Sequence, residues 1–376
     1  MTTVVALIPT FNRARFLSEC INSVLSQTRP PDEVIVIDDG STDHTPAVLS
    51  EWAGLVRVLR KENGGKSTAL NLGLEHTDAD LVWICDDDDI ACPDALARLE
   101  VALDAAPNAP FAYGKFQWFF EKDGQRHYQH HSNYGRLEEP SFFLNALEEM
   151  FAFQFAMLVR RSAYKTVGPF RTDLHRSQDF EMLARLTRIG DPVFVPHTVF
   201  LQRRHNGPRG PAGERISAAQ TFAKSIQYGG RVLTDFRRAL PLEAFVPGFA
   251  RGWSEHRDRA ALLQLGVTFA KRAMWTEALD ELEAAVALDP DAMMTAEEHR
   301  LPRQVIRTHS SWVMLATQPE AITRLRLLTQ SRFGKAIARA IVAAAWNRAA
   351  QAGRQRHHRN ALVTSRLATR LTLTIR

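Results

Sequence analysis

The sequence predicts an α/β fold in its first half, with a mostly parallel sheet and helices on both faces, followed by an α-helical region. Short apolar runs alternate with helical stretches over roughly the first hundred residues. Such alternation is typical of parallel sheets built from strand–helix–strand units. Beyond about residue 215 the strand patterns fade, so we expect a change of architecture there.

Four strands and three helices are expected in the first hundred residues. The strands are the apolar runs 4–8, 33–37, 55–59 and 81–85. Pro9 is expected to stop the first of them. The helices are a stretch carrying Phe16 to Leu25, a second with Asp43 or Thr45 as N-cap and Pro46 in its first turn, and a short one from Ser67 to Leu74.

Polar residues follow three of these strands, at 9–12, 38–40 and 86–89. In open α/β sheets ligands bind beyond the carboxyl ends of the strands, where the strand order switches, so one crevice is expected to collect all three loops. The four consecutive aspartates from Asp86 to Asp89 repel one another unless a cation compensates. A metal–nucleotide complex is the expected ligand; the alternative is an acidic turn with solvated side chains.

Composition indicates an ordinary globular protein of 376 residues, 45% hydrophobic and 24% charged. The three cysteines, Cys20, Cys85 and Cys92, are too few for a disulfide framework or a zinc site and read as reduced thiols. The N-terminus does not resemble a signal peptide, and no apolar run reaches the length of a membrane span. A cytoplasmic protein is expected, with the inner face of the cell membrane as an additional hypothesis.

The motifs of the first half resemble those of inverting family 2 glycosyltransferases with the GT-A fold, in the family's order and spacing. They are IPTFNR (8–13), SVLSQT (23–28), VIDDGSTD (36–43), NGGKSTALNLGL (63–74) and ICDDDDIACPDAL (84–96). Downstream, RSQDFEMLARL (176–186) resembles the family's acidic motif and RRHNG (203–207) its late histidine-bearing loop. The resemblance implies a GT-A catalytic domain over 1–215, with a nucleotide-binding half at 1–100 and an acceptor half at 101–215.

The resemblance also implies which residues hold a nucleotide-diphosphate sugar. Asp39 is expected to accept a hydrogen bond from the base, and Lys66 is expected to meet the diphosphate or the ribose. The full expected set is Pro9, Thr10, Asn12, Asp38, Asp39, Lys66, Asp86 and Asp87. Local alternatives are an Asx turn at Asp39, turn ordering and helix capping by Thr10 and Asn12, and a solvated lysine at position 66.

In the acidic cluster the family pattern Asp-x-Asp-Asp maps to Asp86, Asp88 and Asp89, with Asp87 at the variable position. Asp88 would ligate Mg²⁺ or Mn²⁺, which stabilises the departing diphosphate. His205 would complete the coordination, and imidazole suits Mn²⁺ better than Mg²⁺. The extra aspartate is expected to raise the pKa of its neighbours when no metal is bound.

The resemblance assigns the catalytic base to Asp179, where the family's usual acidic pair appears as Gln178-Asp179. The alternative is that Asp179 caps the helix that follows, and Glu181 is a weaker candidate for the base. Residues 207–213, rich in Gly and Pro, are expected to form a loop that closes over the donor. The aromatic residues around Trp118 are expected in the core, with an acceptor pocket as the alternative.

The region 216–330 is expected to be helical, with one tetratricopeptide-like unit at 259–292. Small residues at Gly266 and Ala278 would let its two helices approach closely. From Arg332 to the C-terminus the chain contains no Asp or Glu, so 331–376 is expected to form a basic amphipathic helical tail. Such a tail fits an anionic membrane surface or packs on the domain; nucleic-acid binding is not expected.

The resemblance therefore implies an inverting glycosyltransferase that moves a sugar from a nucleotide-diphosphate sugar to a hydroxyl of a saccharide or lipid-linked acceptor. The resemblance implies a role in assembling a surface polysaccharide, a lipopolysaccharide or another glycoconjugate. One alternative is a nucleotidyltransferase, although IPTFNR is not the Gly-rich phosphate loop expected there. The other is a helical-repeat adaptor that binds nucleotide without catalysis.

Overall fold

The computed structural model describes residues 2–131, 141–205, 218–354 and 358–375. The chain divides into two compact units, one formed by 1–138 with 150–228 and the other by 139–149 with 229–376. The division thus falls within helix α8 (Ala218–Ala239) rather than at the expected 215/216 boundary. The second unit also takes in a short segment from the middle of the first, which the sequence patterns did not indicate.

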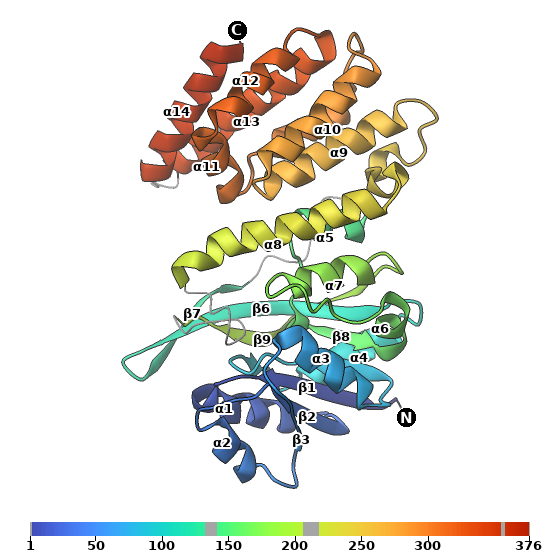
Figure 1. Ribbon diagram of the computed structural model, residues 1–376, viewed down its shortest axis with the longest axis vertical. Helices are drawn as coiled ribbons and strands as arrows, with labels where there is room; N and C mark the ends of the chain where they lie inside the picture. Colours follow the sequence, from blue (N-terminus) through green and yellow to red (C-terminus); the bar gives the residue numbers. More distant parts are fainter. Residues whose placement is uncertain (1, 132–140, 206–217, 355–357, 376) are drawn as a thin grey trace. The chain divides into compact units, whose positions relative to one another are not determined.

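The first unit is built on one mixed sheet with the strand order β3-β2-β1-β4-β8-β6-β9-β5, and β7 pairs with β6 (Figure 1). Its strands are β1 (Val4–Thr10), β2 (Glu33–Asp38), β3 (Arg57–Arg60), β4 (Leu81–Ile84), β5 (Ile90–Ala91), β6 (Phe111–Lys122), β7 (Gln125–His131), β8 (Met157–Arg160) and β9 (Val193–Arg203). The first four are mutually parallel, whereas β8 runs antiparallel to both β4 and β6. β6 and β9 run side by side in parallel.

The helices of this unit each bury apolar residues. They are α1 (Ala14–Leu25), α2 (Thr45–Glu51), α3 (Lys66–Glu75), α4 (Ala95–Asp104), α6 (Arg161–Val167) and α7 (Gln178–Leu186), with the 3₁₀ turn η1 (Gln154–Ala156) before β8. One core cluster joins α1 and α4 to β1, β4 and β9. The aromatic residues Phe116 and Phe119 are fully buried, as expected for core positions.

Three local expectations were wrong in detail. Pro9 does not stop the first strand, because β1 continues to Thr10 and Pro9 pairs with Ile37 in the parallel register. The second helix begins at Thr45 with His44 in the N-cap position, although Asp43 accepts a hydrogen bond from the Thr45 N–H. The third strand lies at 57–60 instead of 55–59.

The strand order switches at β1, which has β2 on one side and β4 on the other. All three strands run parallel, so their carboxyl ends open at the same edge of the sheet. The loops after Thr10, Asp38 and Ile84 therefore converge at the position where α/β sheets bind ligands.

The second unit is helical. Its elements are α5 (Phe142–Glu148), η2 (Leu242–Phe245), η3 (Gly248–Ala250), α9 (Arg257–Lys271), α10 (Trp275–Leu288), η4 (Glu298–Arg300), η5 (Pro302–Gln304), α11 (His309–Thr317), α12 (Pro319–Leu328), α13 (Arg332–Arg354) and α14 (His358–Ile375). The expected hairpin at 259–292 forms as α9 and α10. A Cβ at Gly266 would lie 2.7 Å from Cδ2 of Leu282, so the close approach predicted there is confirmed.

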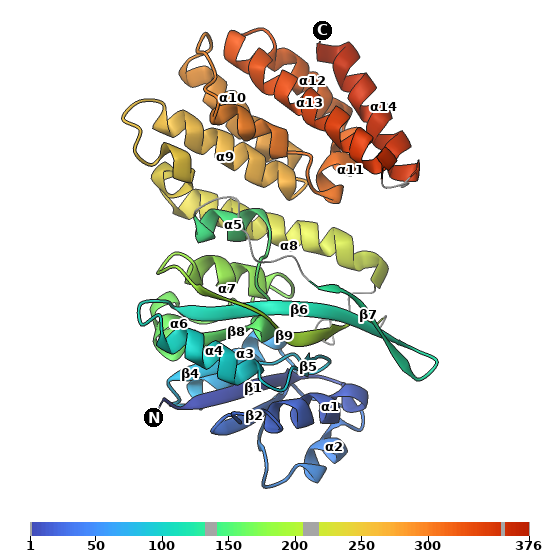
Figure 2. The same cartoon turned by 180° about the vertical axis from the view of Figure 1, so that it is seen from behind.

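The basic tail forms two helices, α13 and α14, which lie side by side (Figure 2). α13 buries an apolar face that includes Phe333, Ile337 and Ile341, so this part of the tail packs within its unit. At its base the guanidinium of Arg259 forms a buried ion pair with Glu298 at 2.8 Å and lies over the Phe333 ring. No helix in the described part of the chain is both long enough and apolar enough to cross a membrane.

Candidate active site at the carboxyl ends of the parallel strands

The loop after β2 is fixed by its own aspartates. Both oxygens of the buried Asp39 carboxylate accept hydrogen bonds from the backbone N–H groups of Gly64 and Gly65 (3.0 and 2.7 Å), from Asn63 and from Lys61. Asp38 accepts from the Ser41 N–H at 2.8 Å. These contacts support the turn-forming alternative for Asp39. Its contact with a nucleotide base stays a prediction.

The loop after β1 is tied to the loop after β2 through Asn12. The backbone of Asn12 has a positive φ of 53°. Its side-chain oxygen accepts hydrogen bonds from the N–H groups of Thr42 (2.8 Å) and Asp43 (3.2 Å). Its own N–H donates to Ser41. Asn12 therefore orders both loops around the crevice, beside Thr10, whose hydroxyl is buried.

The acid loop after β4 turns so that its aspartates have different neighbours. Asp86 is paired with Lys66, and its carbonyl accepts from the Cys20 thiol at 3.3 Å. Oδ1 of Asp89 accepts from the Arg203 N–H at 2.7 Å, and this side chain is buried. Asp89 therefore anchors the loop to the end of β9.

Asp87 lies in an environment that disfavours its charged form. Burial raises its pKa to about 7, and the charge of Asp88 adds to this shift; Arg13, whose Nε lies 3.8 Å from Asp87, and the nearby Thr10 hydroxyl partly oppose it. The sequence predicted a raised pKa at the neighbours of Asp87, whereas the rise found here is at Asp87 itself, with burial as its largest cause. A cation bound here would relieve the repulsion.

Asp88 and His205 form the pair that suits a metal. Nε2 of His205 lies 2.8 Å from Oδ2 of Asp88, and the two side chains are only 12% and 13% exposed. The described residues contain no group of three or more metal-binding side chains. An oxygen–nitrogen pair suits Mn²⁺ better than Mg²⁺, and such an ion would take its remaining ligands from a diphosphate.

Lys66 connects the acid loop to Asp179. Burial lowers the pKa of Lys66, but the charges of Asp86, Asp179 and Asp88 outweigh burial, and the net pKa is raised. The ammonium group is therefore a common electrostatic neighbour of the acid loop and of the start of α7. The charges of two acidic motifs, about ninety residues apart in the chain, therefore both raise the pKa of this lysine.

Asp179 is the second residue of α7, and Ser177 occupies the N-cap position. The alternative that Asp179 caps this helix is therefore wrong. Its Oδ1 accepts only from the neighbouring Phe180 N–H, at 2.8 Å, among the bonds found in the described residues. Glu181, by contrast, is buried and paired with Arg185 at 2.8 Å, which leaves Asp179 as the better candidate for a base.

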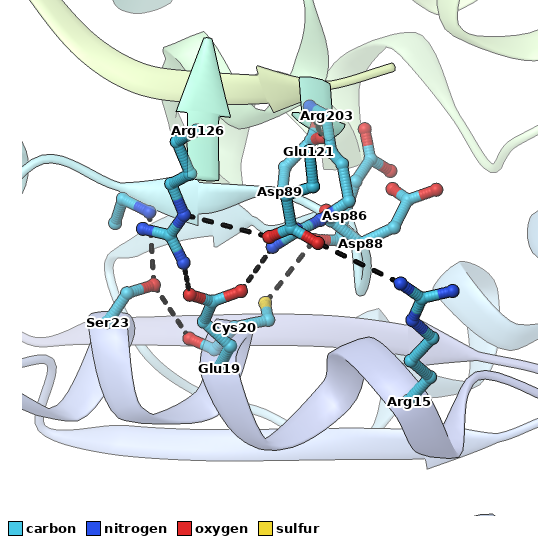
Figure 3. Close-up of polar contacts among 11 residues, drawn as sticks. Arg15, Glu19, Cys20, Ser23, Asp86, Asp88, Asp89, Glu121, Arg126 and Arg203 are labelled. Carbon is cyan, nitrogen blue, oxygen red and sulfur yellow. Dashed lines mark hydrogen bonds and ion pairs between the residues drawn. The ribbon is translucent and has the colours of Figure 1, made fainter. Parts of the chain in front are cut away.

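A buried arginine of the RRHNG motif holds this edge together. The Arg203 guanidinium lies between the rings of Phe16 and Phe119, at 4.9 and 4.6 Å, and is 3% exposed. Figure 3 shows it between Glu121 and Glu19, with Arg126 bridging the same two carboxylates.

Nε of Arg203 donates to the carbonyl of Asp88 at 2.9 Å. The end of β9 is thereby attached to the acid loop, two residues before His205. In the sequence, the tripeptide Arg-Arg-His was the one feature that drew attention to Arg203. Its partners on α1 and β6 carry no motif that could have indicated them. The expected donor-covering loop at 207–213 lies outside the described residues.

Residues 5–168 match the family model described as glycosyl transferase family 2. The chain therefore carries a glycosyl transferase family 2 domain. The matched range contains every site loop up to the acid loop and ends before Asp179 and His205. The family 2 resemblance found in the motifs is confirmed.

Curated relatives of the family 2 domain carry glycosyltransferase names. An uncharacterized glycosyltransferase of Rickettsia conorii is 26% identical over 212 residues, which cover 56% of this chain and 35% of that protein. The glycosyltransferase GlyG of Streptococcus pneumoniae is 31% identical over 122 residues, or 31% of this chain and 40% of GlyG. The chain thus spans well under half the length of these two relatives.

Solved structures resemble the chain in fold. The crystal structure of S. aureus TarS 1-349 superposes with a TM-score of 0.52 at 14% identity, covering 89% of this chain and 90% of that one. The same protein in complex with UDP-GlcNAc gives 0.50 at 14% identity, covering 97% and 91%. With the family 2 domain and this likeness, the predicted GT-A fold followed by a helical region is confirmed.

Proposed function

We propose that this protein is an inverting glycosyltransferase that moves a sugar from a nucleotide-diphosphate sugar to an acceptor hydroxyl. The observation that carries the proposal is the contact of the acid loop with Lys66 and with His205 at the carboxyl ends of the parallel strands, and the charge of Asp179 also acts on the pKa of Lys66. A donor's diphosphate and an acceptor's reacting hydroxyl need these two sets of groups in one crevice. The names of the relatives and the family 2 domain support the same activity.

The donor is held by the loops at the carboxyl ends of β1, β2 and β4. Lys66 contacts the diphosphate or the ribose, and Asp86 or Asp87 faces the ribose. Asp88 and His205 would hold Mg²⁺ or Mn²⁺, which would supply Lewis-acid stabilisation of the departing diphosphate. The complex of TarS with UDP-GlcNAc supports a nucleotide sugar as the class of donor.

Asp179 acts as the base. It takes the proton of the acceptor hydroxyl while the oxygen attacks the anomeric carbon from the face opposite the diphosphate. One C–O bond forms as the bond to the diphosphate breaks, the leaving group keeps the electron pair, and the configuration inverts. The nucleotidyltransferase and the non-catalytic adaptor have no support from the fold or the relatives.

The acceptor is a saccharide or a lipid-linked saccharide of a surface polysaccharide or another glycoconjugate. Contact with an anionic membrane through the tail is part of this proposal. Exposed positions on α14 carry Leu362 (54%), Leu373 (70%), Arg366 and Arg370, a mixture that suits the surface of an anionic bilayer. Sedimentation with anionic vesicles should fall for Leu373→Glu and not for Val101→Glu, an equally exposed position on α4.

Replacing Asp179 with Asn tests the base assignment. The variant should lose about a hundred- to ten-thousand-fold in turnover, the usual contribution of a positioned general base. Its affinity for the donor should stay near that of the wild type, because Asp179 does not hold the nucleotide. Release of nucleoside diphosphate measures turnover, and calorimetry measures donor binding. Turnover equal to the wild type would reject the assignment.

A further inference from the structure

Some buried side-chain polar atoms of the first unit have no hydrogen-bond partner among the described residues. They include atoms of Ser67, Gln154 and Gln178. Ser67 follows Lys66, and Gln178 precedes Asp179. Since folded proteins pair nearly all buried polar groups, an unpaired group beside a proposed binding site indicates a place for a polar ligand.

Gln154 lacks partners for both polar atoms of its side chain. Its side chain is 7% exposed, and neither Oε1 nor Nε2 has a hydrogen-bond partner among the described residues. Gln27, a glutamine of similar burial at 5%, behaves in the ordinary way. Its amide donates to the carbonyls of Ser23 (2.9 Å) and Cys92 (2.7 Å) and accepts from the Leu96 N–H (3.0 Å). Burial alone therefore does not explain the unpaired amide of Gln154.

The strand register brings Gln154 to the edge of the sheet that holds the acid loop. β8 runs antiparallel to β4, with Leu158 opposite Trp83. The chain just before β8 therefore lies at the edge where β4 ends and Asp86 follows. The segment is fixed there because the Trp83 Nε1–H donates to the carbonyl of Phe155 at 3.1 Å, and Phe153 and Phe155 pack on the core cluster.

We propose that Gln154, together with Ser67 and Gln178, binds the hydroxyl groups of a sugar ring held at this site. A carboxamide offers two N–H donors and an acceptor oxygen. Neighbouring sugar hydroxyls each donate and accept, so one amide can pair with two of them. The inference rests on the proposed function, and the sugar is either the donor's transferred residue or the acceptor's terminal one.

The free protein provides the first test, which needs no ligand. Gln154→Met replaces an unpaired amide with an apolar side chain of similar length, and Gln27→Met does the same to a fully paired one. Gln154→Met should melt at the wild-type temperature or above it, whereas Gln27→Met should melt several degrees lower. If Gln154→Met is destabilised as strongly as Gln27→Met, the amide has partners in the free protein and the inference is overturned.

Ligand titrations provide the second test, with UDP, GDP, UDP-N-acetylglucosamine and GDP-mannose as probes. If the amide binds the donor's sugar, Gln154→Met keeps the wild-type affinity for the nucleoside diphosphate. Its affinity for the nucleotide sugar then falls about tenfold. If the amide binds the acceptor's sugar, donor binding by Gln154→Met is unchanged and the KM for a disaccharide acceptor rises about tenfold. No change in either quantity overturns the inference.

These outcomes are distinct from failure of the proposed function. A wild-type chain that binds none of the four nucleotides, or an Asp179→Asn variant with normal turnover, would count against the glycosyltransferase itself. The melting comparison of Gln154→Met with Gln27→Met would still decide whether the Gln154 amide is held without protein partners.

Discussion

Nε2 of His205 lies 2.8 Å from Oδ2 of Asp88, although 117 residues separate them in the chain. Asp88 follows a central parallel strand, and His205 follows the long strand β9. The contact exists because Arg203 bonds to the Asp88 carbonyl and to Asp89 just before the histidine. The proposed metal site therefore depends on how β9 is attached to the acid loop.

Removal of His205 should weaken metal-dependent nucleotide binding. His205→Ala is expected to lower the affinity for UDP or GDP in the presence of Mn²⁺ by at least about tenfold, since changes around a metal site commonly cost that much. Affinity measured with EDTA in place of Mn²⁺ should change little. His197→Ala, an exposed position on the same strand, is the matched control. Equal Mn²⁺ dependence in the two variants would contradict the assignment.

The raised pKa of Asp87 predicts a pH-dependent stability. Its pKa of about 7 in the folded protein is above the value near 4 expected in an unfolded chain. The contribution of Asp87 to the stability of the folded state is therefore most favourable below pH 4, and it becomes less favourable as the pH rises to 7.

The substitution Asp87→Asn removes the ionisable group and therefore this loss of stability with rising pH. In the presence of a chelator the variant should melt a few degrees above the wild type at pH 8, and the gap should shrink steadily toward pH 4.5. A gap that stays constant over this range would show that the ionisation of Asp87 is not the cause. Thermal unfolding followed by circular dichroism is a suitable measurement.

Arg203 should be required for stability as well as for the site. Arg203→Met is expected to lower the free energy of unfolding by about 3 kcal/mol, the low end for a broken buried ion pair, because Glu19 and Glu121 are about one-third exposed. Arg15→Met is the control. Arg15 approaches the same Glu121 at 3.9 Å but is 78% exposed, so its loss should cost under about 0.5 kcal/mol. Urea unfolding measures both, and equal losses would show that burial does not set the cost.

The sequence predicted the parallel half of the fold because each strand there is a short apolar run and each loop carries a motif. Strands β6 to β9 were not placed, since their pattern of aromatic and polar residues has no simple period and their pairing is non-local. The convergence of the loops after β1, β2 and β4 followed from the rule for the carboxyl ends of parallel strands, whereas the role of Asp179 was expected only from the family resemblance.

The partners of Arg203 could not have been predicted in the same way. Glu19 lies on α1 and Glu121 at the end of β6, and nothing in the charge pattern selects them over other carboxylates. The unpaired amide of Gln154 is likewise a property of its surroundings, because a glutamine in an apolar run is equally compatible with a paired state such as that of Gln27.

The helical hairpin of the second unit gives a test of close packing. A Cβ at Gly266 on α9 would meet Leu282 at 2.7 Å and the Ala278 carbonyl at 3.2 Å. Gly266→Ala should therefore lower the free energy of unfolding by about 1–3 kcal/mol through overpacking, against a gain of about 1 kcal/mol in helix propensity.

Gly353 on α13 is the matched control, because a Cβ there meets no atom within 4 Å. Gly353→Ala should leave stability unchanged or raise it by up to about 1 kcal/mol. Urea unfolding of both variants separates backbone propensity from packing. If Gly266→Ala stabilises the protein as Gly353→Ala does, the two helices have room to separate, and the small residue is not what brings α9 and α10 together.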